Sequence, residues 1–553
     1  MATVQRRIGV IFGVFFVLLV VAAARTLYLG TVRAGALRKD AQTQQLSTEV
    51  LPAERGTITD RNGVDLAVSE PAQEIAADPY LIKEPVADAR RLAPLLGQSQ
   101  DQVLRKLSER SGFVYLSRAL PARQARAVMA LKLEGVSGAP TARRVYPRGT
   151  LAAQVLGFVG TEGKGLSGLE YSENSLLKGR AGERRVVNDA LGQPISIENV
   201  KAERPGASLT LTLDANIQQR AEDVLDAVGR VFSPKDATAI VMDPKTGALL
   251  AVANWPQINA DDPSASPPGA GQDRAVGFNY EPGSTFKAIT VSGALERGLI
   301  TPETPFSIPN QIQVADRTIH DAEEHGEETL TTAEILARSS NIGAIKIGLL
   351  EGKDAFNEWV HRYGFGARTG VELPGEETGA TLPLSEYSGS SMGNLPIGQG
   401  ELVTPMQMVS AYATIADGGV LRRPHIISRI DGKPEPGQAG RRVISARTAS
   451  EIRDMLKGVL GPEGTASEIS VPGYQLAGKT GTASKIDPAT GKYSESAYVA
   501  SFIGFAPASD PKLLCAVVVD EPSAGSIYGG TVAAPAFGQI MSFALPYLRV
   551  PPG

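Results

Sequence analysis

Residues 280–287 of this 553-residue chain read Tyr-Glu-Pro-Gly-Ser-Thr-Phe-Lys. Pro282 and Gly283 predict a turn, and the apolar run after them predicts a helix that begins near Ser284. Ser284 and Lys287 would then share one face of that helix, so that the amine can reach the hydroxyl. A serine hydroxyl is a weak nucleophile until a base takes its proton, and a lysine kept neutral by burial or nearby positive charge can act as that base.

Two further stretches support this pair, which alone would be weak because Ser-x-x-Lys occurs by chance in a chain of this length. Residues 339–341 read Ser-Ser-Asn, early in a helical stretch, and offer a second hydroxyl for proton relay and an amide for substrate. Residues 479–482 read Lys-Thr-Gly-Thr at the start of an apolar strand. There a cation, a hydroxyl and a backbone edge without a side chain at Gly481 can receive a peptide by strand addition.

The strand-like runs around these stretches indicate one large catalytic domain. Two runs precede a helix-rich middle and two follow it, at residues 239–242, 248–253, 502–506 and 513–519. Strands at both ends with helices between them predict a single sheet that both ends of the domain complete. The sole cysteine, Cys515, falls in the last run and is expected to be a buried strand residue.

The amino terminus predicts a membrane span. Residues 8–24 are uncharged and rich in Val, Leu, Phe and Ile, and Arg6 and Arg7 precede them. Extended to residue 29, the run is long enough to cross a bilayer. Residues 22–24, Ala-Ala-Ala, would suit cleavage of a signal peptide, but the run is longer than a usual signal-peptide core, which favours a retained anchor. Either alternative exports the rest of the chain.

Between the span and the catalytic domain the sequence predicts a mixed α and β unit. Short helices are expected at residues 87–96, 102–108 and 122–131, and a hairpin is expected around the Asn62-Gly63 turn. Residues 204–206, Arg-Pro-Gly, mark its end. The predicted divisions are a cytoplasmic tail at 1–7, a transmembrane anchor at 8–29, a pedestal at 45–204 and the catalytic domain at 205–547.

Composition excludes several functions. The formal net charge of −4 and the isoelectric point of about 5.8 give no nucleic-acid footprint. Only four histidines exist, so a Ser-His-Asp hydrolase has few candidates for its base.

His320, Asp321 and His325 could be imagined around a metal, but a solvated loop is the favoured interpretation, and no metal or other cofactor is expected.

Ser-x-x-Lys, Ser-x-Asn and Lys-Thr-Gly in this order resemble the signature of penicillin-binding proteins and class A β-lactamases, with Ser340 where the common form has Asp. Residues 55–63, 144–147 and 168–170 resemble the pedestal motifs of penicillin-binding proteins. Landmarks of the transpeptidase domain are resembled by residues 211–214, 243–247, 528–530 and 533–535. No segment resembles a glycosyltransferase domain, so the resemblance is to class B. Glu281 is similar to the septal, cell-division members, whereas elongation-type members more often have Pro there.

The resemblance implies a fold, an activity and a role for each site residue. The fold is a transpeptidase or serine β-lactamase-like α/β (α+β) domain with a central antiparallel sheet and a helical subdomain, preceded by the pedestal and the transmembrane helix. The implied enzyme is a serine D,D-transpeptidase that cross-links peptidoglycan and is acylated by β-lactams. The catalytic residues are Ser284, Lys287, Ser339, Asn341 and Lys479, and the substrate and oxyanion residues are Thr480, Gly481 and Thr482.

The resemblance also implies partners and a location. The substrates are stem peptides ending in D-Ala-D-Ala, and the pedestal is expected to contact a polytopic membrane glycosyltransferase and other divisome proteins, with Arg55 and Asp60 at its surface. The enzyme is expected in the cytoplasmic membrane as a single-pass protein with its catalytic domain outside. The alternatives are an elongation-type transpeptidase, a β-lactamase or a β-lactam sensor. A β-lactamase would need a water-activating group and no pedestal, and a sensor would need further spans.

Overall fold

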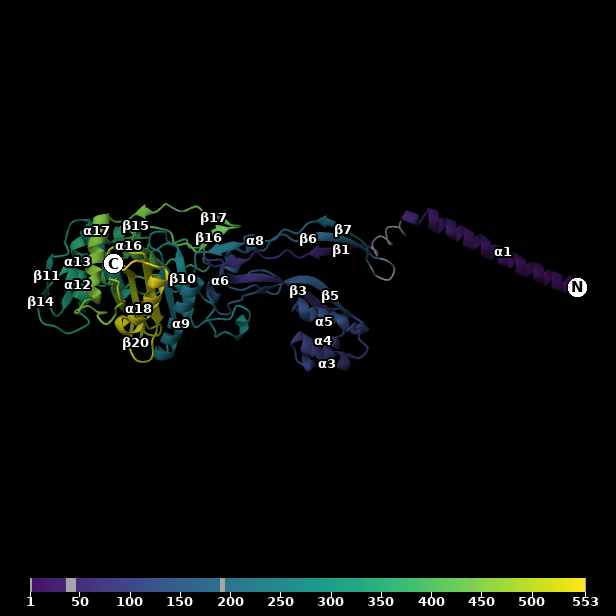
Figure 1. Cartoon of the computed structure of the whole chain (residues 1–553), viewed down its shortest axis with the longest axis horizontal. Helices are drawn as coiled ribbons and strands as arrows, with labels where there is room; N and C mark the ends of the chain where they lie inside the picture. The colour runs from purple at the N-terminus through teal and green to yellow at the C-terminus, as the bar shows by residue number, and fades with distance from the viewer. Residues whose placement is uncertain (1, 36–45, 189–193, 438, 553) are drawn as a thin grey trace. The chain divides into compact units, whose positions relative to one another are not determined.

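The structure is a computed structural model that describes residues 2–35, 46–188, 194–437 and 439–552 (Figure 1). Contacts divide the chain into two compact units. The first unit contains Met1–Glu54, Pro71–Ala142 and Gly179–Pro205, and the second contains Arg55–Glu70, Arg143–Lys178 and Gly206–Gly553. The domain boundary at residues 204–205 stays a prediction; the longest continuous stretch of the second unit begins beside it.

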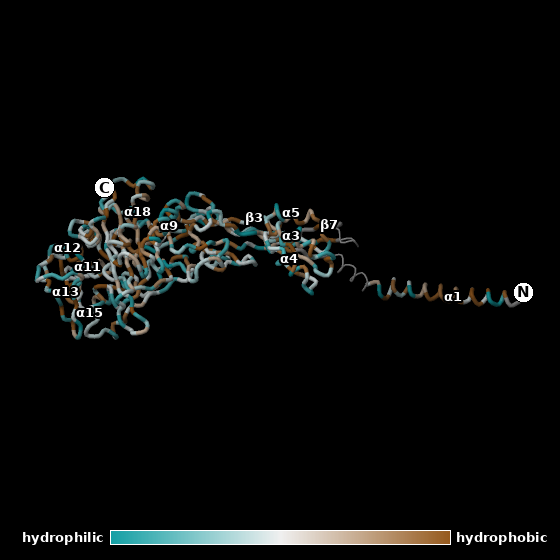
Figure 2. Tube along the Cα trace, turned by 90° about the horizontal axis from the view of Figure 1, so that it is seen from below, coloured by the Kyte–Doolittle hydropathy of each residue, from teal (hydrophilic) through white to brown (hydrophobic). Residues whose placement is uncertain are grey.

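Helix α1 (Ala2–Thr31) is apolar around its whole circumference over most of its length (Figure 2). Val4–Thr31 contains 28 residues, none of them buried against the rest of the chain. At about 1.5 Å per residue this segment is roughly 42 Å long, more than the ~30 Å hydrocarbon core of a bilayer. Among the residues that the structure describes it is the one helix long and apolar enough to span a membrane, and it includes the predicted residues 8–29.

The first unit combines a small helical layer with strands. Ser99 begins α4 with a capping box, since its hydroxyl accepts the Gln102 N–H while the Gln102 side chain accepts the Ser99 N–H. The helices pack on β4 around a core that includes Ile75, Leu92 and Val128. These elements are α3 (Pro85–Leu96), α4 (Gln100–Leu107), β4 (Val114–Pro121) and α5 (Ala122–Ala130). They agree with the three predicted helices. The unit also contains an antiparallel sheet of β1 (Leu46–Leu51), β6 (Gly182–Asn188) and β7 (Pro194–Lys201).

The second unit contains an antiparallel five-stranded sheet in the order β10-β9-β21-β20-β19. Val517 in the middle strand pairs with Ala239 on one side and Phe502 on the other. Both ends of the unit therefore complete one sheet, as predicted, and Cys515 is buried within it. The strands are β9 (Asp236–Met242), β10 (Leu249–Trp255), β19 (Ala477–Ile486), β20 (Tyr493–Ala506) and β21 (Leu513–Asp520).

Helices cover the sheet so that every residue of β9 and β21 is buried. Helices α9 (Ala215–Phe232) and α18 (Gly529–Tyr547) pack on the strands and on each other, and α16 (Pro405–Ala416) packs on β9, β20 and β21. Helices α11 (Lys287–Glu296), α12 (Thr332–Arg338), α13 (Asn341–Glu351), α14 (Lys353–Arg362) and α17 (Ala446–Leu456) form the helical part predicted between the strands (Figure 1).

The stretches that resemble pedestal motifs meet in the second unit. Glu170 is fully buried and pairs with Arg55 through one carboxylate oxygen and with Arg144 Nε through the other, at 2.6 Å. Loss of any one of these three side chains would leave a buried charge without its partner, which lowers the stability of the fold. The predicted hairpin is present, with β2 (Ile58–Thr59) paired to β3 (Asp65–Ala77).

The expectation that Arg55 and Asp60 lie at the surface is wrong. Arg55 is 8% exposed and Asp60 is fully buried. Asp60 Oδ1 accepts the backbone N–H groups of Asn62 and Val64 at 2.7 and 2.8 Å, and Oδ2 accepts the Ala215 N–H at the start of α9 at 3.1 Å. The carboxylate is thus a structural bridge between the hairpin and α9, and substitution at either position would disturb packing within the second unit.

Candidate active site

Ser284 lies on a turn that the chain fixes from several sides. Gly283 has φ +54°, a conformation that glycine adopts without strain, and its N–H donates to Gly398 O at 3.0 Å. The 3-10 turn η3 (Gly283–Phe286) continues directly into α11. Tyr412 Oη donates to Thr285 O at 2.7 Å, and the Phe286 side chain is fully buried. The predicted helix start at Ser284 is therefore confirmed, with its first turn in 3-10 form.

The Lys287 amine lies at the centre of the cluster. Its side chain is fully buried, and Nζ donates to Ser339 O at 2.5 Å, to Ser339 Oγ at 3.3 Å and to Asn341 Oδ1 at 2.7 Å. The second predicted stretch thus surrounds the amine of the first. Within the described part of the chain the Ser284 hydroxyl makes no hydrogen bond, and its residue is half-buried, so Oγ is open to an incoming group.

The Ser339–Asn341 segment is a break between two helices. Ser339 adopts φ +61° and ends α12, and Ser340 caps α13 by accepting the Gly343 N–H. A non-glycine residue in this left-handed conformation costs free energy and persists only where its surroundings hold it. The sequence predicted that Ser339–Asn341 lie early in a helical stretch, and α13 begins at Asn341. The break before α13 turns Ser339 and Asn341 toward Lys287.

The third stretch forms the open edge of the sheet. Strand β19 pairs only with β20, so its other edge carries backbone groups without a strand partner in the described structure. A Cβ on Gly481 would lie 3.1 Å from Pro282 O, which shows how closely this edge approaches the serine turn. Lys479 is fully buried with Nζ 3.3 Å from Thr480 Oγ1, and Thr480 Oγ1 is 2.6 Å from Thr465 Oγ1.

Helix α18 supports this edge from behind. The Gly529 N–H donates to Thr482 Oγ1 at 3.0 Å. A Cβ on Gly529 would lie 2.3 Å from Gly481 O and 2.4 Å from Ser501 O, distances that no side chain tolerates. Glycine at this position therefore lets the helix start press directly against β19 and β20.

Burial lowers the pKa of both lysine amines in the site. Burial lowers the pKa of Lys287 to about 7, and the negative charge of Asp321 acts in the opposite direction. Burial, and then the charge of Lys287, hold the pKa of Lys479 well below its ordinary value. A substantial fraction of Lys287 is therefore the free base at neutral pH, which is the form able to take a proton from a hydroxyl.

Comparison with known proteins identifies this arrangement. The sequence profile of the penicillin binding protein transpeptidase domain matches residues 237–542, and that of the penicillin-binding protein dimerisation domain matches residues 50–211. The chain belongs to the penicillin-binding protein family. Its two domains are those of class B penicillin-binding proteins, and its mixed α/β fold is the one that the family resemblance implied.

Curated relatives in this family match nearly the whole chain. Penicillin-binding protein PbpB of Mycobacterium tuberculosis is 35% identical over 97% of this chain and 84% of its own length. Peptidoglycan D,D-transpeptidase FtsI of Escherichia coli is 32% identical over 99% of this chain and 92% of its own. Among solved structures, penicillin binding protein 3 from M. tuberculosis in complex with aztreonam is 31% identical, with a TM-score of 0.73, and the match covers 91% of this chain and 98% of that one.

Sequence reasoning missed two residues that this penicillin-binding protein places around its site. The loop at residues 320–325 was expected to be solvated, but the Asp321 side chain is only 10% exposed and contacts α13. Glu281 was read only as a mark of the septal type. Its Oε1 accepts the Gly400 N–H at 2.9 Å and the Tyr493 hydroxyl at 3.2 Å, which ties the serine turn to β20. No local pattern indicates either role, because the partners come from distant stretches.

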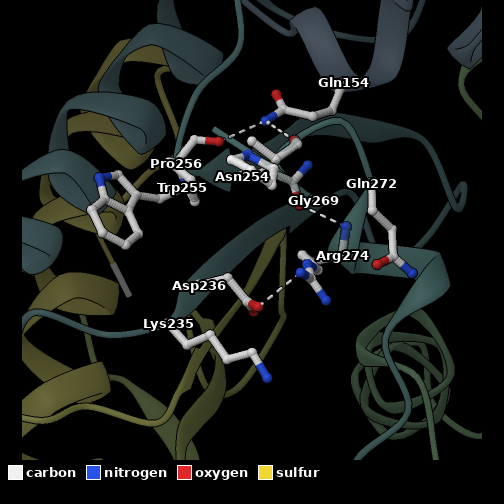
Figure 3. Close-up of a pocket in the computed structure, with 11 residues that line it drawn as sticks. Gln154, Lys235, Asp236, Asn254, Trp255, Pro256, Gly269, Gln272 and Arg274 are labelled. Carbon is white, nitrogen blue, oxygen red and sulfur yellow. Dashed lines mark hydrogen bonds and ion pairs between the residues drawn. The ribbon is translucent and has the colours of Figure 1, made fainter. Parts of the chain in front are cut away.

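A cavity of about 100 Å³ elsewhere in the second unit is not part of this site (Figure 3). Gln154 Nε2 donates to Pro256 O at 2.8 Å and Ala270 O at 3.0 Å, and Arg274 Nη2 lies 3.1 Å from Asp236 Oδ2. None of the predicted site residues of this penicillin-binding protein lines the cavity.

Proposed function

We propose that this chain is a septal peptidoglycan D,D-transpeptidase in which Ser284 forms the acyl-enzyme. The observation that carries the proposal is the contact of the buried Lys287 amine with both Ser339 and Asn341, in a site where β19 approaches the turn that carries Ser284. The same serine would be acylated by β-lactams, as the family name implies.

In the first half-reaction neutral Lys287 takes the proton of Ser284 Oγ, and Oγ bonds to the carbonyl carbon of the penultimate D-Ala. The amide C–N bond then breaks, and the terminal D-Ala leaves after its nitrogen receives a proton. In the second, an amine of a neighbouring stem bonds to the ester carbonyl, the bond to Oγ breaks, and the serine regains a proton. Ser339 would relay these protons, and the 3.3 Å distance between its Oγ and Lys287 Nζ supports this role.

The other site residues bind and stabilise. The backbone N–H groups of Ser284 and Thr482 would form the oxyanion hole, which is usually the largest contribution in acyl transfer. Lys479 and Thr480 would bind the substrate carboxylate, and Asn341 would hold the peptide amide. Gly481, without a side chain, leaves the β19 edge free for an extended stem peptide.

The test is mass spectrometry of the protein after incubation with a labelled penicillin. We expect one covalent penicilloyl adduct per chain, on the peptide that contains Ser284, and no adduct in Ser284→Ala. An adduct that persists in Ser284→Ala would refute the assignment. Rapid loss of the wild-type adduct with turnover of penicillin would instead indicate a β-lactamase.

Two observations support the septal rather than the elongation role. Glu281 precedes Pro282-Gly283-Ser284 in the manner of septal members, and its contacts with Gly400 and Tyr493 give that residue a structural function. Relatives at 32–35% identity include FtsI and PbpB. Localisation of a fluorescent fusion to the division site in dividing cells is the expected result; a label spread along the lateral wall would favour elongation.

We place the catalytic domain on the outer side of the cytoplasmic membrane, anchored by α1, because the stem peptides lie there. The pedestal predicted at residues 45–204, some of which lie outside the described residues, would contact a polytopic glycosyltransferase that supplies the glycan strands, together with other divisome proteins. Support comes from the exposed aromatic residues of the first unit: Tyr80 is 70% exposed and Phe113 is 55% exposed. A Cβ on Gly112, the residue before Phe113, would lie 3.9 Å from the Tyr80 ring, so the chain passes beside Tyr80 at that point.

Tyr80→Ser combined with Phe113→Ser should leave penicillin labelling unchanged but impair septation in cells that depend on this protein. The reason is that both side chains are exposed, so their loss removes an interaction surface without opening the core. Val231→Ser, at a 61% exposed apolar residue of α9, is the matched control and should divide normally. Normal septation in the double variant would remove these residues from the proposed contact.

A further inference from the structure

The loop between β13 (Arg317–Ile319) and β14 (Glu328–Thr331) brings a carboxylate to the start of α13. Asp321 Oδ1 accepts the backbone N–H of Asn341 and, at 3.0 Å, that of Ile342. Asp321 Oδ2 accepts the Ser340 hydroxyl at 2.8 Å. One side chain from a distant loop thus satisfies two of the N–H groups that a helix start leaves without a partner, and also holds the cap residue.

The same helix start carries the groups that bind Lys287. Asn341 is held by its backbone at Asp321, while its side-chain Nδ2 donates to His320 O at 3.0 Å. That contact orients the amide so that Oδ1 faces Lys287 Nζ, 2.7 Å away. Ser339, two residues earlier, keeps its left-handed conformation with its carbonyl on the same amine. Asp321 is therefore the side chain that holds the backbone of residues 340–342 in the position from which Ser339 and Asn341 reach the Lys287 amine.

We propose that Asp321 is a positioning residue of this active site, which fixes the Ser339–Asn341 segment on Lys287 and supplies the negative charge that faces the buried amine. The inference rests on the proposed function, since it assigns Asp321 to the serine–lysine pair of the transpeptidase reaction. Asp321 differs from a simple helix cap because its negative charge acts on the Lys287 amine, in addition to the hydrogen bonds that it accepts from α13.

The charges around the pair have a definite arrangement. Lys287 faces Asp321 from the loop and Lys479 from β19. Asp321 also contacts His325, whose Nε2 is 3.0 Å from Oδ2, and His325 Nδ1 lies 3.6 Å from Glu328. Hydrogen bonding to Gly326 O, and then Asp321, raise the pKa of His325. Because the Asp321 charge favours protonated Lys287, removing that charge should make the amine a free base at lower pH.

The experiment measures the second-order rate constant of acylation by a fluorescent penicillin as a function of pH in the full chain. In Asp321→Asn the amide oxygen can still accept the α13 N–H groups, so we expect a loss of no more than about tenfold in the limiting rate at high pH. The midpoint of the pH profile should move down by about one unit, the lower end of what a nearby charge produces. Asp321→Ala, which loses both the hydrogen bonds and the charge, should lose roughly 10²-fold in the limiting rate at high pH and show the same lowered midpoint as Asp321→Asn. Asp321→Glu should retain the wild-type midpoint.

Asp214 provides the matched control. It caps α9 in the same way, accepting the Asn216 and Ile217 N–H groups at 3.0 and 3.4 Å, but lies outside the site. Asp214→Asn should lower stability without moving the midpoint. An unchanged midpoint in Asp321→Asn would overturn the proposal even if Asp321→Ala fails to fold, and so would an Asp321→Ala variant that acylates within about threefold of the wild type. A wild-type chain that is not acylated at all would contradict the proposed function instead.

Discussion

Replacing Lys287 with Met is expected to slow acylation by β-lactams roughly 10²–10⁴-fold while leaving the chain folded, because a positioned base commonly contributes that factor. Methionine has a similar length and no branch, so it can fill the volume of the buried side chain. What disappears is the amine that faces Ser339 and Asn341.

The pH dependence gives this prediction its specificity. Burial lowers the pKa of Lys287 to about 7, so the fraction of free base rises as pH rises through neutrality. Acylation of the wild type should increase over the same interval, and the residual rate of Lys287→Met should not. Stopped-flow measurement of penicillin acylation, with circular dichroism to verify folding, tests both statements. Lys346→Met, at a half-buried lysine of α13 whose amine contacts Ser307 O, is the control. If the two variants acylate equally fast, another group activates the serine.

Gly529→Ala should damage both stability and acylation, although the change adds one methyl group outside the catalytic residues. The new Cβ would lie 2.3 Å from Gly481 O and 2.4 Å from Ser501 O, and these are backbone atoms that cannot rotate away. Overpacking of this kind typically costs about 1–3 kcal/mol of unfolding free energy. A displacement of β19 by about 1 Å would also move the Thr482 N–H away from the reacting carbonyl, for which we expect a loss of roughly 10²-fold in acylation rate.

Thermal unfolding and penicillin acylation of Gly529→Ala, measured in parallel, test this prediction. Gly271→Ala is the matched control, because a Cβ at that glycine meets nothing within 4 Å. Both quantities should stay at wild-type levels in the control. A Gly529→Ala protein with unchanged melting temperature and rate would show that α18 can withdraw from β19 without consequence.

The sequence predicted the sheet and the serine helix because their signals are local. Runs such as residues 513–519 are apolar throughout, as expected of a strand buried on both faces, and β21 is buried along its whole length. The three-residue spacing of Ser284 and Lys287 lies within one helical turn. The meeting of Lys287 with Ser339 and Asn341 is not local, and it could be anticipated only through the family resemblance.

Burial of polar residues was the feature that sequence reasoning could not supply. Arg55 and Asp60 are charged residues of the kind usually found at a surface, yet both are buried. Glu170 pairs with Arg55, and the start of α9 donates to Asp60, and both partners lie far along the chain. Asp321 is the same case: its acidic neighbours suggest solvent, whereas its contacts lie in α13. In each instance the deciding partner is absent from the local pattern.

The position of β21 in the middle of the five-stranded sheet governs when this sheet can form. Its pairing of Val517 with Ala239 joins the first strand of the sheet along the chain to the last, so the contact order of this sheet is high and loop-closure entropy opposes its formation. The ribosome synthesises β9 and β10 long before β21. Until β21 is made, the edge of β9 has no strand partner and can mispair with other chains. A chain cut short before Leu513 would therefore carry Ser284, Lys287 and Lys479 without the central strand that holds β9 and β20 together, and would become a substrate for proteases instead of an enzyme.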